Sequence, residues 1–545
     1  MGRQLASDRI LVVDDFPSMR MSIRRMLREL GAEQVDLAAN GEEAIKVLRR
    51  TPYDIILCDY NLGEGKDGQQ VLEEGRHMGL IPPAAVFVMI TAETSARFVL
   101  GALEYQPDDY IAKPFTKELL ALRLKKLTER AEALRDIQEA IGREEYLAAI
   151  ELCEQRLAEK GKYLAEVARL LGELYLRVGD YSRAVTTYEK ILNRRSFHWA
   201  RFGLAKAFHF LGEHARAANL FEELLADNRN FIEAYDWLAR ARLAAGDGRR
   251  AQEVLAQALA LSSKSVGRQR ELGRVALTNE DLETAERAFR AAIREGEHSA
   301  LKQAEEYTSL TDILMQTKRS QKALTNLKKA REAFRERPDD QVQVLASSAE
   351  VLEAQGKHEE AAQMLQQASQ LYRTRASEIG EARSLKLART ALAFGDEGLA
   401  RTVLGALVRN NHDEPEYLDK ARALLEAAGA GFDVDELIDG SAEEMRALNA
   451  RGIELAEQGD LAAAMALFEE AAEGAPSNRS FNLNAAQVMH PDDAEGGRQR
   501  IAAVQGTPVP GTGGACRQDR RPPQAAHPHV PGPAQRPCAG RGDRR

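Results

Sequence analysis

The stretch Tyr53-Asp54-Ile55-Ile56-Leu57-Cys58-Asp59 decides the fold of the first part of the chain. Its apolar core, rich in β-branched residues, is typical of a strand buried on both faces of a parallel sheet. Open parallel sheets place their ligand sites beyond the carboxyl ends of the strands. We therefore expect Asp59 to lie at a ligand site on the sheet edge.

Three further apolar runs also end in polar residues. They are residues 10–13 followed by Asp14 and Asp15, residues 86–90 followed by Thr91, and residues 109–112 followed by Lys113. Parallel strands end at one edge of their sheet, so three carboxylates, a hydroxyl and an ammonium are expected to meet there. A lone Asp after a strand is usually a turn former or a helix cap. Four matching strand ends favour a functional site instead.

These groups predict a specific chemistry. Clustered carboxylates repel one another, and a hard divalent cation, preferably Mg²⁺, allows all three to stay ionised. A carboxylate beside such a cation can attack a phosphoryl group and form an acyl phosphate. The hydroxyl, the ammonium and the metal would share the charge of the phosphoryl oxygens.

Residues 8 to about 128 resemble a response-regulator receiver domain of the CheY-like fold. The resemblance rests on Asp14-Asp15, Asp59, Thr91-Ala92 and Lys113-Pro114-Phe115. It implies an α/β doubly wound five-stranded parallel sheet, which we assign to residues 1–128.

The resemblance also implies a role for each site residue. Asp59 would be the phospho-acceptor and would bind Mg²⁺ together with Asp15, with Asp14 through water, and with the backbone carbonyl of Asn61. The remaining implied roles are phosphoryl stabilisation by Thr91, Lys113 and the backbone N–H of Ala92, switching by Thr91 and Tyr110, and tuning of dephosphorylation by Asn61 and Glu93.

The loop after Asp59 departs from the family pattern. The family usually carries a Pro and then Asp-Gly, whereas residues 61–68 have no Pro and are one residue longer, with Gly63 and Gly65. Glycine makes a loop easier to bend and more costly to order. We expect this loop to be mobile.

Bulk properties limit the class of protein. A chain of 545 residues is too long to fold around a single hydrophobic core, so two or more domains are expected. The formal net charge of −9 argues against nucleic-acid binding by bulk electrostatics. The four cysteines lack metal-ligand spacing, and no apolar run approaches the roughly 20 residues of a membrane span. The expected location is the cytoplasm.

From about Leu119 the helical pattern is uninterrupted. We expect the last receiver helix to continue through Ala131, Leu134 and Ile137 into a helical coupler over residues 129–144. A continuous helix would be a stiff connection between the receiver and the next domain.

The middle of the chain is repetitive. Ala184, Ala217, Ala251 and Ala285 are separated by 33, 34 and 34 positions. This resembles the tetratricopeptide repeat (TPR), a helix pair with a period of about 34 residues. The expected packing residues are Gly179, Ala184, Tyr188, Gly212, Ala217, Phe221, Gly246, Ala251, Ala285, Phe289, Gly459, Ala464 and Phe468.

The repeats predict a TPR-like α-solenoid, an all-α superhelix, over residues 145–476. Its later units drift to intervals of 38 to 39 residues, and residues 427–440 look irregular. Trp199 and Trp237 are interpreted as core or groove-lining residues. Residues 477–545 are rich in Arg, Pro and Gly, and we expect a disordered tail there, with an out-of-frame origin as one hypothesis.

No other catalytic constellation is recognisable, so an enzyme is not expected. The sequence predicts a response regulator phosphorylated on Asp59 by a histidine kinase or a phosphotransfer protein. Its output would be phosphorylation-dependent protein binding in the TPR groove, with a signalling enzyme as one kind of target. Two alternatives stay open, a constitutive TPR scaffold whose receiver is a phosphate sink, and a transcriptional regulator that touches nucleic acid through the basic tail. No membrane partner is expected.

Overall fold

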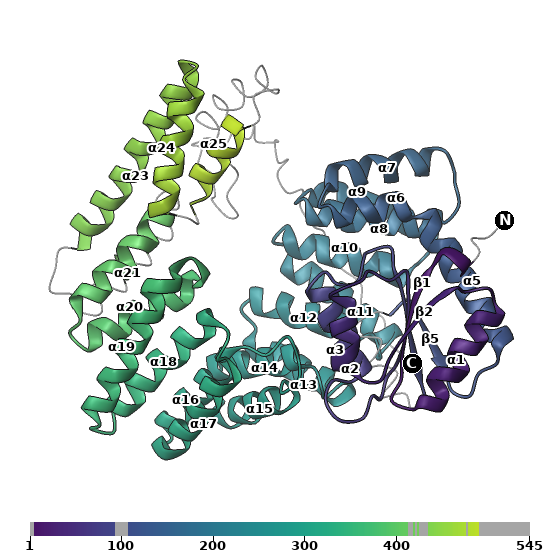
Figure 1. The fold of residues 1–545 in the computed structure, drawn as a ribbon, viewed down its shortest axis with the longest axis horizontal. Coiled ribbons are helices and arrows are strands. Elements are labelled where there is room, and N and C mark those ends of the chain that lie inside the picture. Colours follow the sequence, from purple (N-terminus) through teal and green to yellow (C-terminus); the bar gives the residue numbers. More distant parts are fainter. Residues whose placement is uncertain are drawn as a thin grey trace, which may run out of the picture. The chain divides into compact units, whose positions relative to one another are not determined.

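The computed structural model describes residues 5–92, 107–411, 418–419, 422–423, 434–475 and 478–489 (Figure 1). The chain divides into two compact units. The first comprises residues 1–404 with 421–434, and the second comprises residues 405–420 with 435–545. The receiver and most of the solenoid therefore belong to one unit.

The first unit begins with a short 3₁₀ helix, Leu5–Ser7, and a five-stranded sheet. The strands are β1 (Arg9–Val13), β2 (Gln34–Ala38), β3 (Ile55–Asp59), β4 (Val86–Thr91) and β5 (Asp109–Ala112). Their order is β2-β1-β3-β4-β5, and all neighbours pair in parallel. The expected doubly wound sheet is confirmed. No continuous apolar run marks β2, because it is an edge strand in which exposed residues interrupt the buried ones.

Helices cover both faces of this sheet. Alternate residues of β1 point to opposite sides, so Ile10 and Val12 join one core and Leu11 and Val13 the other. The first core includes α1 (Pro17–Glu29) and α5 (Lys117–Ala133), and the second includes α2 (Gly41–Leu48) and α3 (Gly68–His77). Buried on both faces, the strands carry their polar ends to one common edge.

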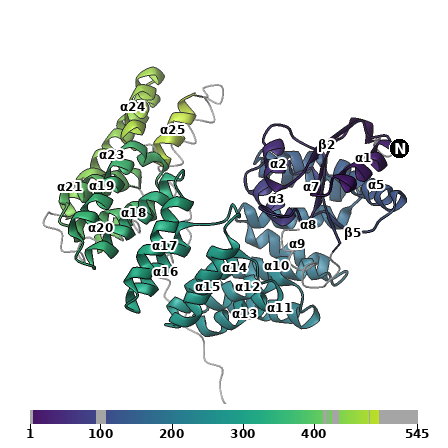
Figure 2. The same cartoon turned by 60° about the horizontal axis from the view of Figure 1, so that its bottom comes forward.

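The described residues from 135 to 410 form helices and no strand, and consecutive helices from α6 to α20 pack against each other as stacked pairs (Figure 2). The helices are α6 (Arg135–Gly142), α7 (Tyr146–Ala158), α8 (Leu164–Arg177), α9 (Tyr181–Leu192), α10 (His198–Phe210), α11 (His214–Asp227), α12 (Ile232–Ala244), α13 (Gly248–Leu261), α14 (Val266–Thr278), α15 (Leu282–Glu295), α16 (Ala304–Gln316), α17 (Ser320–Ala333), α18 (Pro338–Glu353), α19 (His358–Arg375), the 3₁₀ helix η2 (Ala376–Glu378), α20 (Glu381–Ala393) and α21 (Glu397–Asn410). The expected TPR-type helical run is confirmed.

The expected single helix between receiver and solenoid is wrong. Helix α5 ends at Ala133, and α6 begins after Leu134, whose φ of −112° and ψ of 5° are not helical. Leu134 instead turns into the solenoid core. Arg156 fixes the bend, because its guanidinium donates to the Ala133 carbonyl and to Asp136. The connection is thus a bend held by a solenoid residue.

Tyr188 shows how the repeats pack. Gly179 ends α8 with a φ of +79°, a conformation that favours glycine. Tyr188, on the following helix, is almost fully buried, and its ring lies directly against Gly172 of α8 and Gly203 of α10. Small residues on the flanking helices therefore make room for one large ring, as the repeat pattern predicts.

Gly203→Ala is expected to destabilise the solenoid by about 1–3 kcal/mol, since overpacking of a filled core has this cost. A Cβ at position 203 would lie 2.2 Å from the Tyr188 ring. The matched control is Gly267→Ala in α14, where a Cβ meets nothing within 4 Å. Urea unfolding followed by circular dichroism would compare the two variants. Equal midpoints would contradict this account of the packing.

The second unit contains α23 (Val434–Glu457), α24 (Leu461–Gly474) and α25 (Arg479–Met489). Phe468 and Phe481 are buried in its core. Residues 434–440 are helical, so this part of the expected irregular stretch is regular, and residues 424–433 lie outside the described residues. The expected disordered tail over residues 477–545 is wrong in its first part, because Arg479–Met489 form α25. Residues 490–545 lie outside the described residues. No described helix combines the length and apolarity needed to cross a membrane.

Candidate functional site

The carboxyl edge of the sheet gathers the predicted polar groups. Asp59 is the last residue of β3 and Thr91 the last of β4, while Asp14 and Asp15 follow β1 and Lys113 follows β5. The carboxylates of Asp14, Asp15 and Asp59 offer oxygens that all lie within 4.8 Å of one another. The juxtaposition expected from the strand ends is therefore present.

Lys113 bridges two of the acids. Its Nζ donates to Asp14 Oδ2 and to Asp59 Oδ2, each at 2.7 Å. Both carboxylates are buried, with 1% of Asp14 and 5% of Asp59 exposed. Burial raises the pKa of Asp59, and the hydrogen bond from Lys113 opposes that rise. Burial by itself lowers the pKa of Lys113, but the bonds and charges of Asp14 and Asp59 outweigh it, and the pKa is raised overall.

The surroundings of the Asp15 carboxylate show whether this acidic cluster is suited to a cation. Its Oδ1 is buried and has no hydrogen-bond donor among the described residues. An unsatisfied buried carboxylate oxygen is costly unless a cation or water meets it. Asp14 is fixed by the Phe16 N–H, which donates to its Oδ1 at 2.9 Å. Three carboxylates with oxygens close together, including the Asp15 carboxylate with its unpaired oxygen, match the all-oxygen ligand set that Mg²⁺ prefers.

The other predicted residues lie as follows. Asn61 follows Asp59 closely, and its backbone bonds to the Asp59 carboxylate. The carbonyl of the buried Thr91 accepts from the Lys113 N–H at 2.6 Å, and Ala92 is exposed at the end of β4. Tyr110 lies within β5 and is half-buried. Glu93 lies outside the described residues, as do its neighbours up to residue 106.

The solenoid carries a second candidate site, a cavity of about 840 Å³ lined by the first helices of successive pairs. Trp199 and Trp237 both line it, as expected. The Lys206 Nζ lies 4.9 Å from the centroid of the Trp237 ring, and the Arg240 guanidinium lies 4.8 Å from it. We call this cavity the groove.

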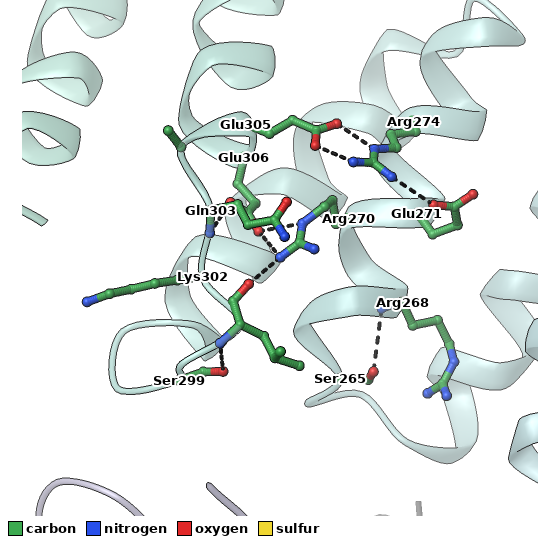
Figure 3. Close-up of polar contacts among 12 residues, drawn as sticks. Ser265, Arg268, Arg270, Glu271, Arg274, Ser299, Lys302, Gln303, Glu305 and Glu306 are labelled. Carbon is green, nitrogen blue, oxygen red and sulfur yellow. Dashed lines mark hydrogen bonds and ion pairs between the residues drawn. The ribbon is translucent and has the colours of Figure 1, made fainter. Parts of the chain in front are cut away.

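The cations of the groove fall into two groups. The four arginines of the first group pair with carboxylates: Arg169 with Glu173, Arg268 with Asp236, Arg270 with Glu306 and Arg274 with Glu305. The last two pairs appear in Figure 3. Lys206 and Arg240 make cation–π contacts with Trp237, and the charges of Glu173 and Glu233 also act on Lys206. Burial lowers the pKa of Lys206. The sequence reading missed these two cations, although Phe202 and Lys206, four residues apart on α10, were a usable signal.

The sheet order defines a doubly wound domain with a cluster of three acidic residues at the carboxyl edge of its sheet. The profile of the response regulator receiver domain family matches residues 10–125, and tetratricopeptide repeat profiles match residues 169–231, 238–300, 307–374 and 445–470. Chemotaxis protein CheY-3 of Vibrio cholerae is 33% identical over 128 residues, which are 22% of this chain and 92% of that protein. Chemotaxis protein CheY of Pseudomonas aeruginosa is 32% identical over 122 residues, 22% of this chain and 97% of that protein. The chain belongs to the response regulator receiver family and continues into tetratricopeptide repeats.

Two solved structures also match the receiver part. The receiver domain protein of Methanospirillum hungatei is 25% identical, and the match covers 23% of this chain and 97% of that one with a TM-score of 0.22. The response regulator TrrA of Thermotoga maritima, solved in complex with Mg²⁺ and beryllofluoride, is 33% identical, with 22% and 98% covered and a TM-score of 0.20.

Proposed function

We propose that this response regulator accepts a phosphoryl group on Asp59 from a histidine kinase or phosphotransfer protein and acts by binding a protein partner in the groove. The observation that carries the proposal is the Lys113 ammonium held 2.7 Å from both Asp14 and Asp59. An ammonium at that place balances the carboxylates before transfer and can hold a phosphoryl oxygen afterwards. Receiver and TPR modules are typically non-catalytic signalling or scaffold modules, which agrees with an output by binding.

Each polar residue at the carboxyl edge of the sheet has its own role in the phosphoryl transfer. An Asp59 oxygen attacks the phosphorus of the donor's phosphohistidine, so that a P–O bond forms while the P–N bond breaks. Lys113, the Thr91 hydroxyl and the Ala92 N–H then hold the phosphoryl oxygens. Asp14, Asp15, Asp59 and the Asn61 carbonyl would bind Mg²⁺, which supplies positive charge to the transferring group. Movement of Thr91 toward the phosphoryl group would let Tyr110 follow, and Asn61 and Glu93 would tune the lifetime of the product.

The groove indicates the chemistry of the partner. Lys206 and Arg240 place positive charge beside the Trp237 ring, where a ligand carboxylate would meet it. Trp199, Phe202 and Phe231 supply apolar and aromatic surface beside them. A protein segment with acidic and apolar side chains would satisfy both features, because carboxylates would meet the cations and apolar groups would cover the rings.

Binding can be measured with the chain's own fluorescence. Trp199 and Trp237 are the only tryptophans, and both line the groove, so their emission reports its occupancy. The probe is a synthetic peptide of repeated Glu-Leu-Asp-Phe units. Lys206→Glu is expected to weaken its binding on the order of tenfold, which corresponds to about 1.4 kcal/mol and to the loss of one charge-assisted contact. The control is Lys190→Glu on α9, an exposed position outside the groove. Equal affinities for both variants would contradict the assigned groove.

Gating is tested with the same probe. Addition of beryllofluoride and Mg²⁺ is expected to change the probe's affinity for the wild-type chain and to leave Asp59→Asn unaffected. An unchanged affinity in both would favour the constitutive scaffold with a phosphate-sink receiver. A binding of nucleic acid that falls steeply with salt and is lost without residues 490–545 would favour the second alternative.

A further inference from the structure

Helix α3 is buried on more of its surface than a helix that only covers a sheet. Seven of its ten residues are buried, whereas two of the thirteen residues of α1 are buried. The buried set includes Glu73 and Glu74, two charged residues next to each other in the sequence. Adjacent helical residues do not share one face, so a second element must cover the side of α3 that faces away from the sheet.

That element is the turn between α15 and α16 of the solenoid. The Ser299 hydroxyl donates to Glu73 Oε1 at 2.6 Å, and both residues are buried. In the loop before α3, the Lys66 ammonium donates to the His298 carbonyl at 3.1 Å and pairs with Glu74 at 3.4 Å. The receiver therefore contacts the solenoid far from the covalent connection at Leu134.

The first residue of the same helix packs directly against the backbone of Asp59. Gly68, the first residue of α3, donates its N–H to the Tyr60 carbonyl at 2.8 Å. A Cβ at position 68 would lie 2.1 Å from the Asp59 carbonyl oxygen, so only glycine allows this approach. The loop between Asp59 and α3 is also tied to α2, because the Lys66 N–H donates to Glu42 at 3.0 Å. A displacement of the Asp59 backbone would therefore also displace the start of α3.

On its other side the α15–α16 turn lies beside Arg270 (Figure 3), and its Leu301 lines the groove. The Leu301 N–H donates to Ser299 Oγ at 3.0 Å, and the Leu301 carbonyl accepts from the Arg270 guanidinium at 2.5 Å. Arg270 is also bound to Glu306 of α16. Leu301 and Arg270 both line the groove.

We propose that residues 296–303, here called the relay segment, transmit the state of Asp59 to the groove through α3. The receiver holds the segment at His298 and Ser299, and the groove holds it at Leu301. The receiver and the groove both contact this short segment, so each biases the equilibrium between its conformations. The coupling between the receiver and the groove must therefore be reciprocal. This route leaves the receiver through α3, which packs on the opposite face of the sheet from α5. It adds a mechanism to the proposed function and requires no partner to be tested.

Hydrogen exchange of the full-length chain tests the relay segment. The comparison is Mg²⁺ alone against Mg²⁺ with beryllofluoride, without any partner present. We expect the exchange rate within residues 296–303 to change by about threefold or more in the wild-type chain, because local opening there depends on the contact with α3. Ser299→Ala removes the hydroxyl that joins Glu73 to Leu301 and is expected to abolish this response. Ser320→Ala, at the start of α17, is the matched control and should respond like the wild type.

Exchange in residues 55–62 shows independently that beryllofluoride has reached Asp59. A response there with unchanged exchange in residues 296–303 would overturn the relay while leaving the proposed phosphorylation intact. A full response of the relay segment in Ser299→Ala would also overturn it. Absence of any response in either region would overturn both the relay and the proposed function. Because no peptide is added, a failure of the groove assignment cannot be mistaken for a failure of the relay.

Discussion

Asp59→Asn is expected to lower phosphoryl incorporation from acetyl phosphate and Mg²⁺ by more than about 100-fold, because an amide oxygen is a far weaker nucleophile than a carboxylate. Asn has nearly the shape of Asp, so the fold should persist. The change also removes one of the two carboxylates that Lys113 bridges. Intact-mass spectrometry of the chain after timed incubation would measure the phosphorylated fraction directly.

Asp54→Asn is the matched control for this experiment. Asp54 precedes the same strand, β3, at its opposite end, where it accepts a hydrogen bond from the Arg9 N–H at 3.0 Å. Phosphoryl incorporation should stay close to that of the wild type in this variant. Undiminished labelling of Asp59→Asn, or loss of labelling in Asp54→Asn with the fold intact, would contradict the assignment of the phospho-acceptor.

The receiver site was predictable because each of its members is set by local sequence. Asp59, Thr91 and Lys113 stand at the ends of apolar runs, and a parallel sheet brings such ends to one edge whatever the rest of the chain does. The helical solenoid was predictable for a similar reason, since Ala184 and its successors recur at a fixed interval. The expected mobility of the loop over residues 61–68 stays a prediction, although Lys66 is held there by three contacts.

The features that escaped prediction depend on residues far apart in the sequence. The bend at Leu134 is held by Arg156, and nothing in the residues around Leu134 interrupts the helical pattern. The burial of Glu73 depends on Ser299, 226 positions away. From sequence alone, Glu73 and Glu74 look like ordinary solvated acids of a surface helix. Periodicity shows which face of a helix covers a sheet, but it carries no information on a second neighbour.

Leu224→Ala is expected to destabilise the solenoid by about 2–5 kcal/mol, the usual cost of truncating a fully buried leucine. Leu224 lies on α11 with 0% of its surface exposed, and α11 packs between α10 and α12. Each helix pair of a solenoid is stabilised mainly by its neighbours, so a cavity in α11 weakens α10 and α12 as well. These two helices carry Trp199 and Trp237, and no tryptophan lies elsewhere in the chain. Urea unfolding followed by tryptophan emission therefore reports this part of the solenoid and is blind to the receiver.

Leu211→Ala makes the same chemical change at the end of α10, where 42% of the residue is exposed. A surface truncation of this kind usually changes stability by no more than about 0.5 kcal/mol. The two variants should differ in the urea midpoint while sharing the slope of the transition, because the surface exposed on unfolding is nearly the same. Coinciding midpoints would mean that the cooperative unit around α11 does not depend on its buried leucine, and the nearest-neighbour account of the solenoid would then fail. A lowered midpoint for Leu224→Ala with receiver phosphorylation unchanged would show that the receiver domain folds without a fully stable solenoid. Any coupling between them would then act through contacts such as those of the relay segment, with each domain folding independently.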